Sequence, residues 1–298
     1  MQNKEKRTGL IWCVIAYVVA IVAAVAAGWV VRDSHPLVVV AVADATGTLV
    51  VFAFSVFFNN SSFYDPYWSV APPAIALFWL WTGRAELSDG SLIRSVLLCA
   101  VVFMWGARLT YNWARGWRGL KHEDWRYVDI RNATGRGYWP ASFLSIHFLP
   151  TTVVYAGCLA FYPALGLTGR PFNFLDAAGF VVCIAAVWIE AAADKQLHRF
   201  VSTREDPLAI LETGLWAYSR HPNYFGEVLF WWGVYLFGVA ARPDLWWIIA
   251  GPVAMTLLFL FISIPLIDTR MLKLRPHYRE RVKRVSRLIP WFSFSNDS

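Results

Sequence analysis

The side chains best suited to chemistry in this sequence gather in two short stretches of its C-terminal half. In the first stretch, Glu190, Asp194 and His198 recur at four-residue intervals. Residues spaced in this way lie on one face of an α-helix, so the three side chains are predicted to form a column. Glu190 lies within an apolar run, where a charge costs about 2.5–3.5 kcal/mol and usually marks function. An amphipathic helix end would explain Lys195 and Arg199, but not Glu190.

The second stretch surrounds an Arg-His-Pro sequence. Arg220 and His221 place a cation and a titratable group before Pro222, a residue that disfavours helix at the preceding position and suits the first turn of the next helix. Asn223 and Glu227 are then one turn apart on that helix. A helix N-terminus beside an arginine is suited to phosphate, and Glu227 can accept hydrogen bonds from an amide or a ribose hydroxyl. This pattern favours a binding site over a purely structural loop.

The elements that position these residues are predicted to cross a membrane. Of the 298 residues, 57% are hydrophobic and 16% are charged, against about 25% charged in soluble domains. The mean hydropathy is +0.44. This composition excludes a disordered chain, and the numbers of Gly and Cys exclude collagen and disulfide scaffolds. The class that remains is a polytopic membrane protein with an all-α fold.

The apolar runs predict about eight spans. Seven runs approach or reach the length of about 20 residues that a bilayer requires: Leu10–Val31, Pro36–Phe58, Leu92–Leu109, Ser142–Phe161, Phe174–Ala193, Tyr224–Ala240 and Trp246–Ile267. Val70–Trp81 is shorter and contains two prolines, so it is either an eighth span or a re-entrant segment, which would leave seven spans.

The basic residues favour eight spans with both termini in the cytoplasm. In that arrangement the inner segments carry 21 Lys and Arg residues and the outer segments carry four, in agreement with the positive-inside rule. We therefore expect an integral multi-pass protein of a bacterial inner membrane. We attribute the net charge of +7 to the basic residues that orient the protein in the membrane, so no nucleic-acid partner is expected. The four cysteines lie in apolar runs, and neither a disulfide framework nor a metal site is expected.

Charged residues also occur within other predicted spans. Asp44 either has a functional role or makes a polar contact between helices, and both interpretations remain open. Arg108 either belongs to a site or extends its charge to the membrane surface. Arg94 lies near a helix end, and we expect its guanidinium to reach the surface in this way.

The two stretches carry a resemblance to a known family. The segment Gly214–Glu227, with Glu190 and Asp194 before it and Arg287–Pro290 near the end, resembles the C-terminal domain of the steroid 5α-reductase family, and in particular its bacterial branch. The resemblance extends over about residues 90–298. It implies that residues 91–298 form an NADPH-binding membrane domain with a cytoplasmic basic tail, and that residues 1–90 are N-terminal helices on the substrate side.

The resemblance also implies roles for individual residues. Asp194 is similar to the family's acidic cofactor ligand, and Asn223 and Glu227 are similar to its pair near the nicotinamide. Arg108 is similar to the arginine of a His-Arg segment, and Arg115 to a later arginine near the phosphates. The predicted cofactor contacts are Arg108, Arg115, Glu190, Asp194, Arg199, Tyr218, Arg220, His221, Asn223, Tyr224 and Glu227.

One departure from the family pattern concerns the catalytic group. Trp105 stands where the family has the tyrosine that polarises the substrate carbonyl. We take Tyr64, Asp65 and Tyr111 as the alternative candidates for this role, because they lie nearby in the predicted topology. Cofactor binding is therefore better supported than a steroid substrate.

The resemblance implies a reductase with NADPH as cofactor. Hydride would pass to the β-carbon of an enone in a lipophilic substrate, which would reach the site from the surrounding membrane lipids. Two alternatives remain open. The Arg-His-Pro string also resembles isoprenylcysteine and phospholipid methyltransferases, which bind S-adenosylmethionine, although their paired glutamates are absent at Ile267–Arg270. A lipid-binding protein that has lost its chemistry is the second alternative.

Overall fold

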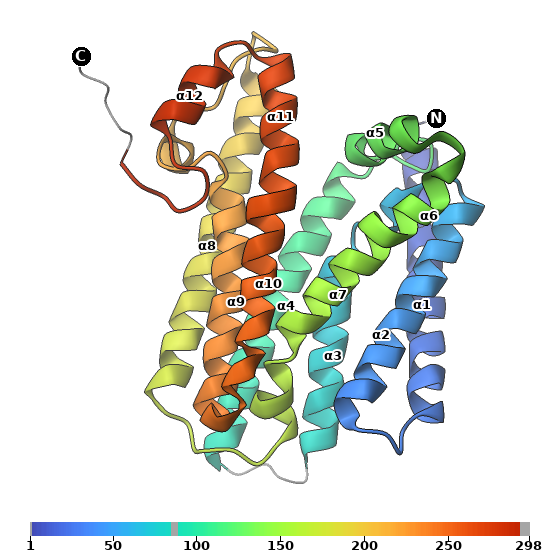
Figure 1. The fold of residues 1–298 in the computed structure, drawn as a ribbon, viewed down its shortest axis with the longest axis vertical. Coiled ribbons are helices and arrows are strands. Elements are labelled where there is room, and N and C mark those ends of the chain that lie inside the picture. The colour runs from blue at the N-terminus through green and yellow to red at the C-terminus, as the bar shows by residue number, and fades with distance from the viewer. Residues whose placement is uncertain (1, 85–88, 293–298) are drawn as a thin grey trace.

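The computed structural model describes residues 2–84 and 89–292, and within these ranges the chain forms helices and no strands. This confirms the predicted all-α membrane bundle (Figure 1). The helices are α1 (Gln2–Val30), α2 (Pro36–Phe57), α3 (Tyr67–Gly83), α4 (Asp89–Gly116), α5 (Trp125–Thr134), α6 (Tyr138–Ser142), α7 (Leu149–Cys158), α8 (Phe174–Thr203), α9 (Pro222–Ala241), α10 (Ala250–Leu258), α11 (Ile264–Leu274) and α12 (Tyr278–Arg284).

Seven helical segments in the described ranges are long and apolar enough to cross a membrane. One of them extends from Trp125 to Cys158 and includes α5, α6 and α7, with a break after α5 at Gly135, whose φ is +52°. Another extends from Pro243 to Leu274 and includes α10 and α11. The protein is therefore an integral multi-pass membrane protein.

The short proline-containing run forms α3, which is longer than the sequence predicts. Its 17 residues extend about 26 Å at 1.5 Å per residue, slightly less than a hydrocarbon core of about 30 Å. Pro73 cannot donate to the Ser69 carbonyl, and that carbonyl lies against α4 at Gly106, where an added Cβ would come within 2.7 Å of it. The Ser69 hydroxyl also contacts the Thr110 hydroxyl at 2.8 Å. Contacts with α4 thus accommodate the prolines of α3.

The two ends of the bundle differ in charge. α1 begins at the end where α4, α8 and α11 finish, as Figure 1 shows, and Lys6 donates to the Arg115 carbonyl there at 3.0 Å. The segments at this end carry 21 of the 27 Lys and Arg residues, so we call it the basic end. α3 finishes at the opposite end, where Gly83 packs against the Leu165 carbonyl. With α3 included, the chain passes between the two ends eight times.

Arg94 corrects one prediction from the sequence. Its side chain is 1% exposed and does not extend to the surface. It donates to both carboxylate oxygens of Asp176, at 2.7 and 2.8 Å, and to the carbonyls of Arg170 and Pro171. Asp176 also closes a capping box with Asn173 at the start of α8. These acceptors satisfy the N–H groups of the planar Arg94 guanidinium. Arg94 therefore links α4 and α8 inside the protein.

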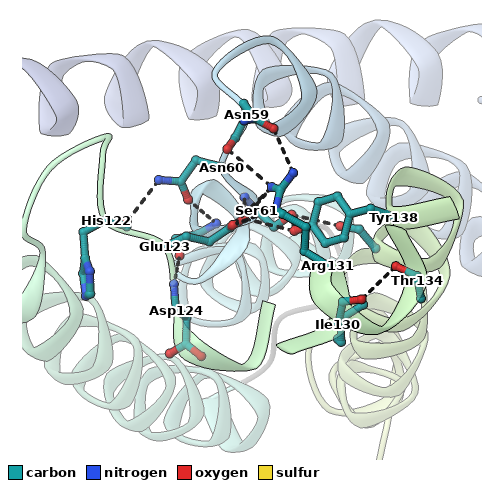
Figure 2. A network of polar contacts seen from close by, with 12 residues as sticks. Asn59, Asn60, Ser61, His122, Glu123, Asp124, Ile130, Arg131, Thr134 and Tyr138 are labelled. Atoms are coloured by element: carbon teal, nitrogen blue, oxygen red, sulfur yellow. Dashed lines mark hydrogen bonds and ion pairs between the residues drawn. The ribbon is translucent and has the colours of Figure 1, made fainter. Parts of the chain in front are cut away.

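A polar network at the basic end secures the segment between α2 and α3 (Figure 2). Glu123 accepts hydrogen bonds from the backbone N–H of Ser61 at 2.7 Å and from the Tyr138 hydroxyl at 3.0 Å. Arg131 contacts both oxygens of the same carboxylate, at 3.3 and 3.1 Å. Asn60 adds a bond to the Leu120 carbonyl. The network holds this segment against α5 and α6.

Candidate functional site

Three helices bring a charged cluster together near the basic end. Arg108 of α4 donates to Asp194 of α8 at 2.8 Å and is also paired with Glu190, one helical turn earlier. Asn112, one turn after Arg108, donates to the same oxygen of Asp194 at 2.8 Å. The side chain of Asn223 of α9 lies close to that of Asp194 as well. We call these five residues the Asp194 cluster.

The Asp194 cluster is largely buried and incompletely satisfied. The side chain of Glu190 is 3% exposed and that of Arg108 is 13% exposed, while Asp194 retains 24% exposure. Arg108 Nε and Glu190 Oε1 are both buried without a hydrogen-bond partner. An unsatisfied buried polar atom costs about 1–3 kcal/mol, so the Asp194 cluster is held together at a cost in folding stability.

Glycine explains how α9 comes so close to this cluster. An added Cβ at Gly226 would lie 2.4 Å from the Cγ atom of Glu190 and 2.9 Å from the Ala186 carbonyl. No other residue type fits this position without displacing α8. Gly226 thus lets α9 present Asn223 and Glu227 beside α8.

Glu227 is surrounded by indole N–H donors. Its carboxylate accepts hydrogen bonds from Trp68 at 3.2 Å, Trp105 at 3.0 Å and Trp231 at 2.9 Å. Trp105 is fully buried and stacks on Phe230, with ring centroids 4.7 Å apart. These three indole N–H donors satisfy much of the hydrogen-bonding capacity of the buried carboxylate. The tryptophan at the tyrosine position of the reductase pattern is therefore a partner of Glu227.

The Arg-His-Pro turn contacts a different carboxylate. Asp268 of α11 accepts hydrogen bonds from Arg220 at 2.7 Å, His221 at 3.0 Å and Tyr278 at 2.6 Å. Burial lowers the pKa of His221, and the neighbouring Asp268 partly opposes this shift. Tyr224 stacks on the His221 ring, with centroids 5.5 Å apart. Arg220 and His221 therefore join the turn to α11 and lie outside the Asp194 cluster.

Four predicted site residues lie at the surface. Tyr111 is 64% exposed, and Arg115 lies over its ring at 5.9 Å. Arg199 is exposed on α8. Tyr218 is 45% exposed and packs against Phe292. No hydrogen bond or ion pair joins these four side chains to the Asp194 cluster, although the charge of Arg115 is close enough to act on Asp194.

The remaining two candidates come from the segment before α3. The hydroxyl of Tyr64 contacts that of Thr151 at 2.6 Å, and its ring stacks on Tyr67. Asp65 accepts a hydrogen bond from the Tyr127 hydroxyl. Burial raises the pKa of Asp65 to about 7, although the charge of nearby Arg126 opposes this shift. Asp65 is thus a carboxyl group that can hold a proton near neutral pH.

Several partners were not predicted from the sequence. Asn112 could have been found, because it follows Arg108 by one helical turn on the same face. Trp68 and Asp268 are distant in sequence from the residues that they contact, and no local pattern indicates those contacts. Among the described residues, no group of three or more His, Cys, Asp or Glu side chains is placed to hold a metal ion.

Comparisons with known proteins place the chain in a family. The chain is 28% identical over 218 residues to an uncharacterized protein of the fission yeast Schizosaccharomyces pombe. The alignment covers 66% of this chain and spans only 62% of that relative's length. No solved structure matches the chain. Residues 51–285 match the family described as "Protein of unknown function (DUF1295)". This match covers most of the helices described above, the Asp194 cluster, Glu227 and Asp268, so the chain belongs to the DUF1295 family.

Proposed function

We propose that the protein is a membrane-embedded reductase that uses NADPH to reduce a C=C bond conjugated to a carbonyl group in a lipophilic compound. The observation that carries the proposal is the Asp194 cluster, which brings Arg108, Glu190, Asp194 and Asn223 together from three helices. The same residues carry the sequence resemblance to the steroid 5α-reductase family. We further propose that the basic end faces the cytoplasm, where NADPH is available.

The chemistry of the cluster fits this cofactor. Glu190 and Asp194 supply acceptors for ribose hydroxyls, and Asn223 supplies an amide that can pair with the carboxamide of nicotinamide. The unpaired Glu190 Oε1 and Arg108 Nε offer one acceptor and one donor in a buried position. Exposed Arg115 and Arg199 at the same end are suited to the phosphates.

When bound, the cofactor would supply a hydride to the β-carbon of the substrate. The protein must then stabilise the negative charge on the substrate oxygen and deliver a proton to the α-carbon. Asp65 is suited to hold this proton because its pKa is raised to about 7. Apolar helices around the site would exclude water and strengthen each hydrogen bond. Tyr111 is less suited to this role because its side chain is exposed.

A ligand-dependent thermal shift tests the proposal. NADPH should raise the melting temperature of the purified protein, and S-adenosylmethionine should not. Asp194→Asn and Asn223→Ala should each weaken the NADPH shift. Asp244→Asn is the matched control because Asp244 is exposed at the opposite end. A shift with S-adenosylmethionine alone would favour the methyltransferase alternative. No shift with either ligand would favour a lipid-binding protein without this chemistry.

A further inference from the structure

A large apolar groove lies between α1, α2 and α3. Its volume is about 980 Å³, and no residue of the Asp194 cluster lines it. α1 contributes Ala20, Ala24 and Gly28 at four-residue intervals, so small side chains form its wall. Trp29 and Trp81, which are 66% and 58% exposed, also line it. The groove is therefore open towards the lipid side of the bundle.

One carboxylate in this groove is deeply buried. Asp44 is 7% exposed and is the ninth residue of α2. The Tyr67 hydroxyl donates to its Oδ1 atom at 2.7 Å and to its backbone carbonyl at 2.8 Å. Gly47 makes room for this hydroxyl, since an added Cβ would come within 2.9 Å of it. No ion pair joins Asp44 to a described Lys, Arg or His.

The side chain of Asp44 has acceptor positions that no protein donor in the described residues fills, so a ligand at this site would have to supply a hydrogen-bond donor. A carboxylate has about four acceptor positions, and the contacts of this one run to Tyr67 alone. The Tyr67 proton is already donated to Asp44 and cannot serve a ligand at the same time. A ligand that complements the groove must therefore donate a hydrogen bond from one end of an apolar body.

The depth of Asp44 excludes ordinary phospholipids as complementary ligands. The ninth residue of α2 lies about 12 Å along the helix from its start, well inside a hydrocarbon core of about 30 Å. A phospholipid keeps its headgroup at the membrane surface and would present only its hydrocarbon chain to Asp44. A lipid amine would carry a charge into this depth, at a high desolvation cost. A neutral hydroxyl combines a donor with a small desolvation cost.

We propose that the α1–α3 groove binds a lipid alcohol, whose apolar body lies along α1 and α3 and whose hydroxyl donates to Asp44. The site stands independently of the reductase proposed above. The two sites are adjacent, because Tyr67 contacts Asp44 while its neighbour Trp68 donates to Glu227. The first turn of α3 therefore separates the groove from the carboxylate of α9.

Photolabelling in nanodiscs tests the proposal without any variant. The probe is a diazirine derivative of hexadecanol, and the competitors are hexadecanol and its methyl ether, which has no donor. Peptides from α1, α2 and α3 should carry the label, and the alcohol should compete about tenfold better than the ether, as a hydrogen bond to a charged group implies. Equal competition, or label spread evenly over the spans as for bulk lipid, would overturn the proposal.

Variants then assign the effect to the groove. Asp44→Leu should abolish the preference for the alcohol over the ether. Ala24→Trp should fill the groove and reduce labelling at least fivefold, while Val22→Trp, on the same helix but outside the lining, should not. Unchanged labelling in Ala24→Trp, or a retained alcohol preference in Asp44→Leu, would contradict the proposal. Should a variant elute as aggregate, the wild-type competition decides the question alone.

Discussion

At the scale of single residues, the buried carboxylates of this protein differ in how completely they are satisfied. Glu227 accepts hydrogen bonds from three indoles, and Asp268 accepts them from an arginine, a histidine and a tyrosine. Asp44 has Tyr67 as its hydrogen-bond partner, and Glu190 keeps one oxygen unpaired. The first two have the partners of structural groups, since their hydrogen bonds are supplied within the protein. The last two retain capacity for a ligand.

Asp65 leads to a prediction about pH. Burial raises its pKa from 3.8 to about 7, so between these values the folded protein keeps a proton that the unfolded chain has lost. Stability therefore falls as the pH rises through this window. Asp65→Asn cannot ionise, and it should raise the melting temperature at pH 8 while changing it little at pH 4. Thermal unfolding of both proteins across this range is the measurement.

Two results would contradict this prediction. One is a variant less stable than the wild type at pH 8, which would mean that the ionised carboxylate is the stabilising form. The other is an equal shift at both pH values, which would mean that the effect of the substitution is packing rather than protonation.

At the scale of elements, glycines hold α8 and α9 together. Gly226 faces Glu190, Gly233 faces Cys183, and Gly179 faces the Gly233 carbonyl, and in each case an added Cβ would lie within 3.0 Å of the neighbouring helix. Small residues at a helix contact allow backbones to approach closely in a membrane, where packing replaces the hydrophobic effect as the driving force. This close contact brings Asn223 to Asp194.

Gly226→Ala tests the importance of that contact. The added methyl group meets the Cγ atom of Glu190 and a backbone carbonyl, so we expect a loss of about 1–3 kcal/mol in unfolding free energy. It should also weaken the NADPH shift, because Glu190 and Asn223 would move apart. Gly116→Ala, at the end of α4, has nothing within 4 Å of the new atom and serves as the control. Equal stability of the two variants in detergent unfolding would show that α8 and α9 can adjust without cost.

At the scale of the whole molecule, charge separates the two ends of the bundle. The basic end carries the start of α1, the Arg-His-Pro turn and α12 (Figure 1). Arg32, Arg84, Arg170 and Arg242 are the only Lys or Arg residues in the segments that join the helices at the other end. The positive-inside rule then orients the bundle as a unit, and every segment at one end must face the same compartment.

Single cysteines can test this orientation. Lys283→Cys and Ser202→Cys, both exposed at the basic end, should react with an impermeant maleimide in inside-out vesicles. Arg84→Cys and Asp244→Cys should react in right-side-out vesicles. Cys13, Cys158 and Cys183 are buried, so a background without Cys99 should be nearly unreactive. Labelling of Arg84→Cys from the same side as Lys283→Cys would contradict the alternation of the five spans from α4 to α11.

The spacing of residues along the sequence was sufficient to predict part of the Asp194 cluster. The four-residue spacing of Glu190 and Asp194 placed both carboxylates on one helical face, and the structure brings both to Arg108, which the sequence also indicated. The length and hydropathy of the apolar runs likewise predicted the helical bundle. These features depend on neighbours along the chain, and a helix preserves that order in space.

Contacts between residues far apart in the sequence could not be predicted from local spacing or hydropathy. Trp68 lies 159 residues from Glu227, and Arg94 lies 82 residues from Asp176. Apolar runs in a bilayer predict that helices form but not which faces meet, because lipid and protein are equally apolar partners. Packing of small residues and pairing of buried polar groups decide which helices lie side by side. These tertiary contacts placed Arg94 inside the bundle and turned Arg220 towards Asp268. They also left the groove beside Asp44.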